Sequence, residues 1–501
     1  MKPEGAGPGR RDILRGCAAA ALAAASPPLA ARAIEASRRS LDAVLADLHR
    51  RTFFYFWETS DPRTGLAPDN WPNPDFCSIA ATGFALTAYC IGARAGYVTR
   101  EAAAKRTLAT LRTFWNGPQG PAATGMMGHK GFFYHFLHMD SALRYKSVEL
   151  SSVDTTLFLL GALSAAAFFD GPSPAEAEIR RIGVALYQRV DWTFMARPNG
   201  LISMGWHPEP GRPNHGPDGL IDRNWDRYNE GMMVTLLALA SPTHPSPPQG
   251  WESWTATIGG TWGTSYGETF LGFAPLFGHQ YSHCWYDFRG IADPFMRAHG
   301  SDYFINSARA TRAQRRYAIA NPGGFKDYGT DAWGLTACRG PGYVKVDVGG
   351  RPVVFEGYSA RGPRTGDGEG IDDGTIAPTA GASSIAFAPE ICAPLIHSLR
   401  ARYGDEIYGR YGFVDAFNPS FPRTARPTNG SVRPRAGWTA DAWLGIDQGP
   451  ILIMLENHRS GLIWDLFCRS PLIGRIARRG LARADFRAAG PAGAWLAKET
   501  Q

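Results

Sequence analysis

Residues 275–293 bring acidic, basic and aromatic side chains together in one short run, PLFGHQYSHCWYDFRGIAD. No helical or strand periodicity separates the polar residues from the aromatic ones, whereas an element that only builds a core would separate them. Broad aromatic faces interleaved with charged groups suit a flat, polyhydroxylated ligand such as a sugar. The alternative is a buried junction whose polar groups satisfy one another. We expect the run to form part of a binding cleft.

Hydrolysis of a glycosidic bond needs two carboxyl groups: an acid that protonates the leaving oxygen, and a nucleophile or a base for water. Glu230 is one candidate, because it follows Trp225 and Tyr228 at the expected start of a helix that Asn229 would cap. A helix N-terminus lowers a carboxyl pKa, so an acid here would need desolvation by its aromatic neighbours. The alternative is that Glu230 only complements the helix dipole.

Four further acidic residues are candidates. Asp447, in GIDQGP, stands at the expected start of a helix from Gln448, where a lowered pKa suits a base or nucleophile; simple capping is the alternative. Glu149 and Asp154 flank a serine pair, and helix capping would explain Asp154 without any function. Asp373 belongs to an acidic pair in the glycine-rich segment GIDDGTIAP, which forms either a turn or a site for substrate hydroxyl groups.

Other chemistries find little support. His279, His283 and Asp287 follow one another at intervals of four, which could hold a metal ion on a helix. The zincin motif H-E-x-x-H is missing, however, and Pro275 and Gly278 argue against a regular helix, so neither a metal nor a cofactor is predicted. The sequence also contains no Walker A motif, no G-x-S-x-G elbow and no dinucleotide-binding fingerprint.

The N-terminus resembles a targeting segment. The run RRDILR at 10–15 has the twin-arginine pattern, an alanine-rich stretch covers 16–25, and Ala31-Arg32-Ala33 offers a cleavage site. We expect residues 1–33 to be a signal peptide read by the twin-arginine export machinery, and a mature chain from about Ile34 that is periplasmic or secreted. The apolar run is too short and too weakly apolar to span a membrane. A disordered tail is the alternative.

The distribution of charge and of cysteine bears on the expected partners and on disulfide bonds. Five basic and two acidic residues among the first 33 leave only +4 of the total net charge of +7 for the rest of the chain, without a concentrated basic stripe. Nucleic acid is therefore not an expected partner, and the basic segment at 476–487 is expected to be a solvated tail. The seven cysteines are scattered and form no CxxC pair, so buried free thiols are the default expectation.

Helical patterns alternate with long aromatic-rich connections. Helices are expected at 41–57, 78–95, from Thr99, from Ser151 to 169, from Ser173 to about Phe194, and at 229–240, 301–320, 380–402 and 448–458. The connections at 59–76, 124–150, 199–228, 321–379 and 404–447 are far longer than usual, and long ordered loops on a helical scaffold are commonly functional. The predicted fold is all-α, an (α/α) toroid with a cleft at one end and one β-hairpin at 343–354. An irregular helical bundle is the alternative.

Seven segments in order resemble a bacterial family known as glycoamylase-like, and they span about residues 40–490. They are SIAATGFAL (78–86), GFFYHFLHMD (131–140), ELSSVDTTL (149–157), YNEGM (228–232), the 275–293 run, DDGTIAPTAGASS (372–384) and GIDQGPILIM (445–454). The family includes glycoside hydrolase family 144. The resemblance implies an (α/α)6 barrel over residues 34–490, a short tail at 491–501, and endo-acting cleavage of β-1,2-glucan, not of starch.

The resemblance also implies roles for individual residues. Glu230 in YNE would be the general acid and Asp447 in IDQGP the general base of an inverting, metal-free reaction, with the acid acting either directly or through a substrate hydroxyl group. The implied substrate subsites are Glu149, Asp154, Trp225, Tyr228, His279, Gln280, Asp287 and Asp373. Gly231 stands where relatives commonly have alanine.

Two other functions stay open at this point. One is transglycosylation or hydrolysis of cyclic or substituted periplasmic glucans, which would yield rings or longer chains. The other is a non-catalytic glucan-binding protein on the same scaffold. A polysaccharide lyase would need a cluster of Arg, Lys or metal ligands to neutralise a uronate, and no such cluster is apparent. The oligomeric state does not follow from the sequence.

Overall fold

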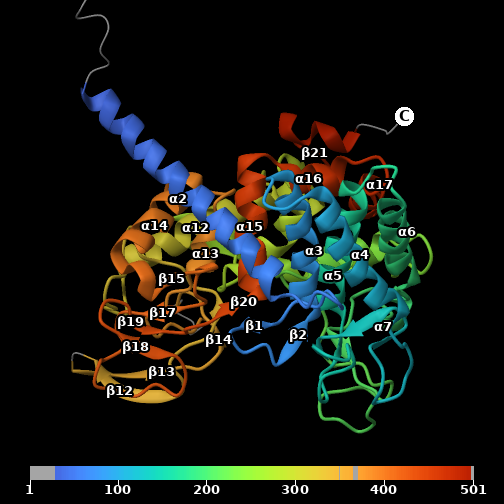
Figure 1. Ribbon diagram of the computed structural model, residues 1–501, viewed down its shortest axis with the longest axis horizontal. Coiled ribbons are helices and arrows are strands. Elements are labelled where there is room, and N and C mark those ends of the chain that lie inside the picture. The colour runs from blue at the N-terminus through green and yellow to red at the C-terminus, as the bar shows by residue number, and fades with distance from the viewer. Residues whose placement is uncertain (1–28, 349, 365–369, 498–501) are drawn as a thin grey trace, which may run out of the picture. The chain divides into compact units, whose positions relative to one another are not determined.

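The computed structural model describes residues 29–348, 350–364 and 370–497. The chain divides into two compact units, Met1–Ala46 and Asp47–Gln501. The described part of the first unit is the beginning of helix α2 (Leu29–Thr59) (Figure 1). The second unit contains all the other described elements. Of the predicted signal peptide, residues 1–28 lie outside the described residues.

Six helical elements of the second unit form a closed inner ring. They are α3 (Ile79–Arg94), α5 (Ser152–Phe168), α8 (Met232–Ala240), α10 (Phe277–Gln280) with the continuing 3-10 turn Tyr281–Cys284, α13 (Pro378–Ala382) and α15 (Gly445–Arg459). Helices α15, α3, α5 and α8 pack in that order. The ring closes through hydrogen bonds from Ser282 Oγ to Glu230 O, from Gln280 Nε2 to Ala380 O and from Thr379 Oγ1 to Asp447 O.

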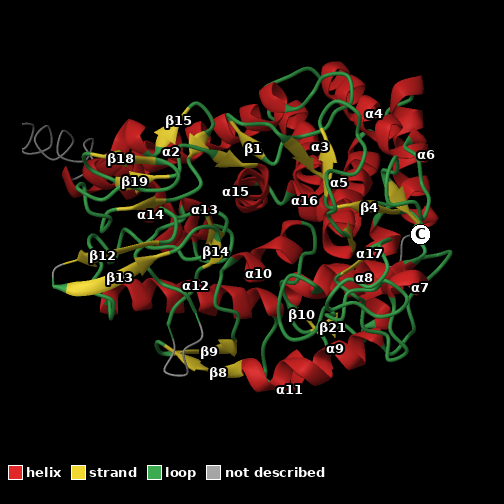
Figure 2. Ribbon diagram, turned by 90° about the horizontal axis from the view of Figure 1, so that it is seen from below, coloured by secondary structure: helices red, strands yellow, loops and turns green. Residues whose placement is uncertain are grey.

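The composition of the inner helices explains why they lie inside. All nine residues of α8, MMVTLLALA, are buried, and α3 and α5 are apolar or small on every side. A helix that is hydrophobic all round is stable only when other elements surround it. Figures 1 and 2 show α3, α5 and α15 side by side in the middle of the molecule.

A second set of helices packs outside the ring and supplies the charged faces. They are α4 (Arg100–Asn116), α6 (Pro174–Arg189), α9 (Gly250–Ile258), α12 (Tyr303–Ala320), α14 (Pro389–Tyr403) and α17 (Gly474–Arg483). In the chain, α4 follows α3, α6 follows α5, α9 follows α8, α12 follows α10 and α14 follows α13, and the members of each pair are in contact. This alternation of inner and outer helices confirms the predicted (α/α) toroid.

The long connections are joined to one another by short antiparallel strands, most of which lie below the helices in Figure 1. The four-stranded sheet consists of β3 (Gly128–His129), β4 (Phe132–Tyr134), β6 (Leu150–Ser151) and β7 (Gly205–Trp206). Strand β1 (Asn70–Trp71) pairs with β20 (Trp443–Leu444), and β17 (Phe417–Asn418) pairs with β19 (Gly437–Thr439). The predicted hairpin is present as β12 (Val344–Val348) and β13 (Arg351–Phe355).

Several predicted helix starts are confirmed by their caps, and others are corrected. Ser78, Ser151 and Ser173 each accept a hydrogen bond from a backbone N–H in the first turn of α3, α5 and α6. The helix expected from Asn229 begins only at Met232. The helix expected over 174–194 is divided into α6 and α7 (Trp192–Met195), and the one over 380–402 into α13 and α14.

The C-terminal segment is not the solvated tail that its charge suggested. Residues 476–487 include most of α17, which packs on α8 so closely that a Cβ at Gly480 would lie 2.5 Å from Leu236 O. Residues Pro491–Ala497 form a 3-10 helix with Trp495 buried under the Arg469 guanidinium. The six cysteines of the described residues are buried free thiols, as expected. No helix among the residues described here has the length and apolar character needed to cross a bilayer.

The contact between α3 and α5 gives a test of the inner ring. A Cβ at Gly83 would lie 2.3 Å from Leu157 O, which is backbone and cannot rotate away. We expect Gly83→Ala to lower the free energy of unfolding by about 1–3 kcal/mol, the usual cost of overpacking, measured by urea denaturation with tryptophan fluorescence. Gly260→Ala is the control, since its Cβ would meet nothing within 4 Å. Equal stabilities of the two variants would contradict this close packing.

Candidate active site

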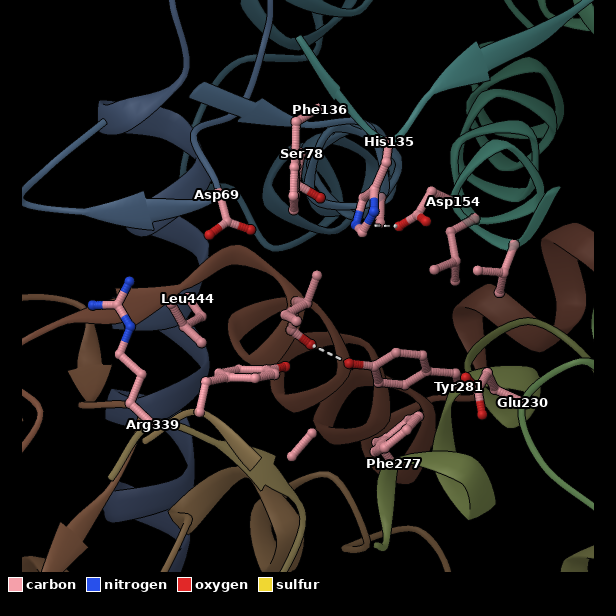
Figure 3. Close-up of a pocket in the computed structure, with 16 residues that line it drawn as sticks. Asp69, Ser78, His135, Phe136, Asp154, Glu230, Phe277, Tyr281, Arg339 and Leu444 are labelled. Atoms are coloured by element: carbon pink, nitrogen blue, oxygen red, sulfur yellow. Dashed lines mark hydrogen bonds and ion pairs between the residues drawn. The ribbon is translucent and has the colours of Figure 1, made fainter. Parts of the chain in front are cut away.

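A cavity of about 380 Å³ lies at the end of the ring where the inner helices begin. Its lining includes the α3 N-cap Ser78 and Ala80 from α3, Val153 and Asp154 from α5, Phe277 and Tyr281 from α10 and the turn after it, and Ile446 from α15. Figure 3 shows Ser78, His135 and Asp154 on one side of the cavity, with Glu230, Phe277 and Tyr281 on the opposite side. Because the side chains come from segments far apart in the sequence, the cavity depends on closure of the ring.

Glu230 lies in the cavity wall just before α8, not inside the helix as the sequence had suggested. Gly231 occupies the N-cap position, and its N–H donates to Asn229 Oδ1 (2.9 Å), so the helix dipole begins after Glu230. Glu230 Oε2 is buried and has no hydrogen-bond partner among the described residues. Desolvation by burial raises the pKa of Glu230 to about 7. Glu230 can therefore carry a proton near neutral pH.

His135 connects two of the predicted subsite residues. It follows β4, and its Nδ1 lies 2.8 Å from Glu149 Oε1 while its Nε2 lies 3.6 Å from Asp154 Oδ1 (Figure 3). Burial alone would lower the pKa of His135, but Asp154 and Glu149 outweigh burial and raise it to about 9. Burial would raise the pKa of Glu149, yet the hydrogen bond with His135 lowers it to about 2. The cluster therefore holds an imidazolium between two carboxyl groups at neutral pH.

Asp154 combines capping with a place in the cavity. Its N–H donates to Ser151 Oγ (3.1 Å), and Ser151 Oγ–H donates to Asp154 Oδ2 (2.5 Å), which is a reciprocal start for α5. The same side chain lines the cavity and is 8% exposed. Burial raises its pKa, against the opposing charge of His135. The capping interpretation of Asp154 is therefore confirmed, and its role as a substrate subsite stays a prediction for a residue that lines the cavity.

Asp447 lies in the first turn of α15, behind the cavity lining. It is 5% exposed, and its Oδ2 is buried without a partner among the described residues. Burial and the negative charges of Asp415 and Asp69 raise its pKa well above the usual value, although the helix N-terminus would lower it. Asp69 lines the cavity itself, and its backbone oxygen accepts from Gly445 N (2.9 Å) at the start of α15.

The remaining lining residues include aromatic and basic side chains. Tyr281 reaches across the ring and donates from its hydroxyl to Ile446 O (3.1 Å), next to Asp447 (Figure 3). Tyr358 lines the cavity and is 54% exposed, so its face is available to a sugar ring. Arg339 contributes the guanidinium of the lining.

Two predicted subsite residues before α8 hold the wall instead of lining the cavity. Trp225 is buried, and its Nε1 donates to Ser152 Oγ (2.8 Å), which ties the segment before α8 to the start of α5. Tyr228 is buried with its ring stacked on Tyr303 and tilted against His279. Both side chains fix the segment that carries Glu230.

The expectation that residues 275–293 form a cleft is corrected for most of the run. His279 is fully buried with Nε2 3.2 Å from Phe273 O, and Gln280 Nε2 donates to Ala380 O (2.7 Å). Asp287 is buried in ion pairs with Arg289 and Arg469. Of this run, only Phe277 and Tyr281 are among the residues that line the cavity. The run is chiefly a buried junction, in which His279 Nδ1, His283 Nδ1 and the Tyr286 hydroxyl have no hydrogen-bond partner among the described residues.

Asp373 also lies outside the cavity lining. Its carboxylate receives a bidentate pair from the buried Arg361, with Nε at 2.9 Å and Nη2 at 2.8 Å. Burial would raise the pKa of Asp373, but Arg361 lowers it. This ion pair holds the loop that leads into α13 and explains why an acidic residue is needed there.

Several cavity residues were not singled out from the sequence as individuals. Asp69, which lines the cavity, and Asp415, which lies behind the lining, belong to the long connections 59–76 and 404–447, whose aromatic content was the only available signal. His135 lies in GFFYHFLHMD, a motif noted without a role. No group of three or more His, Cys, Asp or Glu side chains within residues 29–348, 350–364 and 370–497 is arranged to hold a metal ion.

The arrangement can perform acid–base chemistry on a polyhydroxylated ligand. Glu230 supplies a proton at neutral pH, and Asp447 is a second carboxyl group, fixed by a different inner helix. Efficient proton transfer requires a group whose pKa lies near the working pH, as that of Glu230 does. The aromatic side chains beside the acids can pack against the C–H faces of sugar rings.

Known proteins with similar sequences share this scaffold. A family model described as "Putative glucoamylase" matches residues 222–471. The exo-β-1,2-glucooligosaccharide sophorohydrolase (non-reducing end) of Parabacteroides distasonis is 26% identical over 449 residues, 84% of this chain and 55% of that protein. The chain thus spans about half the length of this relative.

Solved structures extend the similarity over nearly the whole chain. A Bacteroides uniformis protein of the same description has a TM-score of 0.73 and 29% identity, covering 90% of this chain and 98% of the other. The endo-β-1,2-glucanase of Chitinophaga pinensis, solved with sophorotriose and glucose, has a TM-score of 0.70 and 25% identity, covering 90% and 99%.

The charge state of His135 can be measured directly. With ¹⁵N-labelled histidine, the NMR titration of His135 should have its midpoint near pH 9, above the usual value of about 6.5, because Glu149 and Asp154 stabilise the imidazolium. In Glu149→Gln the midpoint should fall by about one unit or more. A wild-type midpoint at or below 6.5 would show that burial outweighs the two carboxyl groups and that the His135 imidazole is neutral at neutral pH.

Proposed function

Since this chain belongs to the glycoamylase-like family, we propose that it is a glycoside hydrolase that cleaves β-1,2-linked glucan. The observation that carries the proposal is the buried Glu230, whose pKa desolvation raises to about 7, in a carboxyl-lined cavity at the mouth of an (α/α) toroid. The names of the relatives support the linkage, since the Parabacteroides and Chitinophaga proteins are both described by β-1,2-glucan substrates.

In the proposed mechanism, Glu230 donates its proton to the leaving glycosidic oxygen, either directly or through a substrate hydroxyl group. Asp447 takes a proton from a water molecule, whose oxygen forms the new bond to the anomeric carbon as the glycosidic bond breaks. The attack from the opposite face would invert the anomeric configuration. Placement of the two carboxyl groups on different inner elements, before α8 and in α15, supports separate acid and base roles.

Endo action is part of the proposal, with exo release of disaccharides as the alternative. The chain covers 99% of the Chitinophaga endo-β-1,2-glucanase but only 55% of the Parabacteroides exo-acting protein. Products of mixed length would agree with endo action, whereas sophorose alone would favour the exo mode. Rings or lengthened chains would point to transglycosylation.

Replacement of the acid tests the function. On linear β-1,2-glucan, wild-type protein should release oligosaccharides, and Glu230→Gln should lower kcat by about 10²–10⁴-fold because the general acid is lost. Product chromatography and polarimetry would follow the reaction and its stereochemistry. The matched control is Glu390→Gln, an exposed glutamate in the first turn of α14, which should retain wild-type turnover. Retained turnover in a folded Glu230→Gln variant would remove Glu230 from the acid role.

We further propose export through the twin-arginine pathway, supported by the RRDILR run at 10–15. Replacement of Arg10 and Arg11 by lysine in the full chain should leave the protein in the cytoplasm of a host with a working pathway, measured by fractionation and immunoblotting. Unchanged periplasmic accumulation of the doubly substituted chain would contradict this route.

A further inference from the structure

Asp415 and Asp447 form a buried carboxyl pair. They are 1% and 5% exposed, and after burial the Asp415 carboxyl is the group that acts most strongly on the pKa of Asp447. Neither Asp415 Oδ1 nor Asp447 Oδ2 receives a donor from any other described residue. An ionised carboxylate can only accept hydrogen bonds, so these two carboxyl groups can bond to each other only when one of them carries a proton.

The backbone around the pair holds both carboxyl groups in place. Asp415 N donates to Ala442 O (2.8 Å), and Asp415 Oδ2 accepts from the N–H of Arg339 (3.1 Å), a residue of the cavity lining. On the other side, Gln448 Nε2 donates to Phe413 O (3.1 Å). The segment before Asp415 is thereby tied to the helix turn that carries Asp447, which fixes the two carboxyl groups relative to each other.

We propose that Asp415 is a positioning residue of the reaction, which shares one proton with Asp447 and orients the free oxygen of that carboxyl group toward the attacking water. The proposal rests on the proposed function, in which Asp447 is the base. Asp415 has no role in the sequence prediction, and the cavity lining does not include it. It acts through Asp447 and does not touch the substrate.

The proton balance of the pair is simple. Before the reaction the two carboxyl groups hold one proton and one negative charge. Asp447 takes a proton from water while Glu230 gives its own to the leaving oxygen, so the pair ends neutral with two protons. It returns one proton to solvent, and Glu230 regains one. No oxidant, metal or further reactant is needed.

The surroundings of the pair favour retention of its shared proton. Burial raises the pKa of Asp415 to about 6 and that of Asp447 well above its usual value. The titratable or charged groups that act on the pair are Asp69, Arg339, Arg361, Cys338, Tyr55, Tyr281 and Tyr358. Only the two arginines oppose the negative charge, so ionisation of both carboxyl groups at once is disfavoured.

Asp415→Asn tests the proposal. The amide cannot carry the shared charge, and its N–H₂ would donate to Asp447, so the pKa of Asp447 should fall and its strength as a base should fall with it. A base must be deprotonated to act, so the acid limb of the kcat profile should move to lower pH by about one unit or more. The plateau kcat should fall about 10–100-fold with KM within about twofold. The alkaline limb, which belongs to Glu230, should stay near pH 7.

Asp302→Asn is the matched control. Asp302 is a buried carboxyl group that caps α12 and also accepts from Gly290 N, and it lies outside the cavity lining. Its replacement should leave the pH profile unchanged. An Asp415→Asn variant whose acid limb does not move, whether or not its stability falls, would overturn the proposal, since a structural role alone does not shift that limb.

Two further measurements keep the inference testable if Asp415→Asn folds poorly. In the Glu230→Gln background, the infrared carbonyl band of a protonated carboxylic acid should persist at neutral pH and weaken in Asp447→Asn; its absence would overturn the shared proton. Separately, wild-type turnover by Asp447→Asn in the native background would show that Asp447 is not the base and would overturn the inference. The role of Glu230 as the acid is tested independently by Glu230→Gln.

Discussion

The structure depends on the cost of burying several carboxyl groups around one cavity. The acidic side chains that line or border it are Asp69, Asp154, Glu230, Asp415 and Asp447. The cations among the lining residues are His135 and Arg339. With so few counter-charges in a desolvated space, the carboxyl groups cannot all ionise. Protons therefore stay on some of them at neutral pH, and a site that holds protons near its working pH is suited to acid–base catalysis.

The toroid supplies the geometry in which this can happen. Inner helices that are apolar on every side expose few polar groups except at their ends, so the chemistry is confined to the mouth of the ring. The position of the acidic residue relative to the helix start differs between the inner helices. Helix α8 begins after Glu230, which leaves that acid outside the first turn, whereas Asp447 lies within the first turn of α15 and is governed by its acidic neighbours. The ion pairs of Asp287 and Asp373 stabilise the segments behind the cavity without entering it.

Local chemistry made much of this scaffold predictable from the sequence. Serine caps before apolar runs marked the starts of α3, α5 and α6, and Glu230, singled out close to Tyr228, lies in the cavity lining. Burial, however, is a property of the whole fold. A run of mixed polar and aromatic residues has the same sequence pattern whether it lines a cleft or fills a buried junction, as His279 and Asp287 show. Strands of two or three residues carry no usable period, so the pairings beside Asp69, at the cavity, and beside Asp415, behind the lining, could not be predicted.

A crystal structure of the Glu230→Gln protein soaked with a linear β-1,2-glucooligosaccharide would test most directly whether this cavity is where the reaction takes place. The sugar chain should pass through the mouth of the ring, with one glycosidic oxygen within hydrogen-bond reach of residue 230, directly or through a sugar hydroxyl, and with room for a water molecule beside Asp447 at the anomeric carbon. A chain bound instead along the separate groove formed by residues 260–276 and α12, with the carboxyl-lined cavity empty, would contradict the assignment of both carboxyl groups.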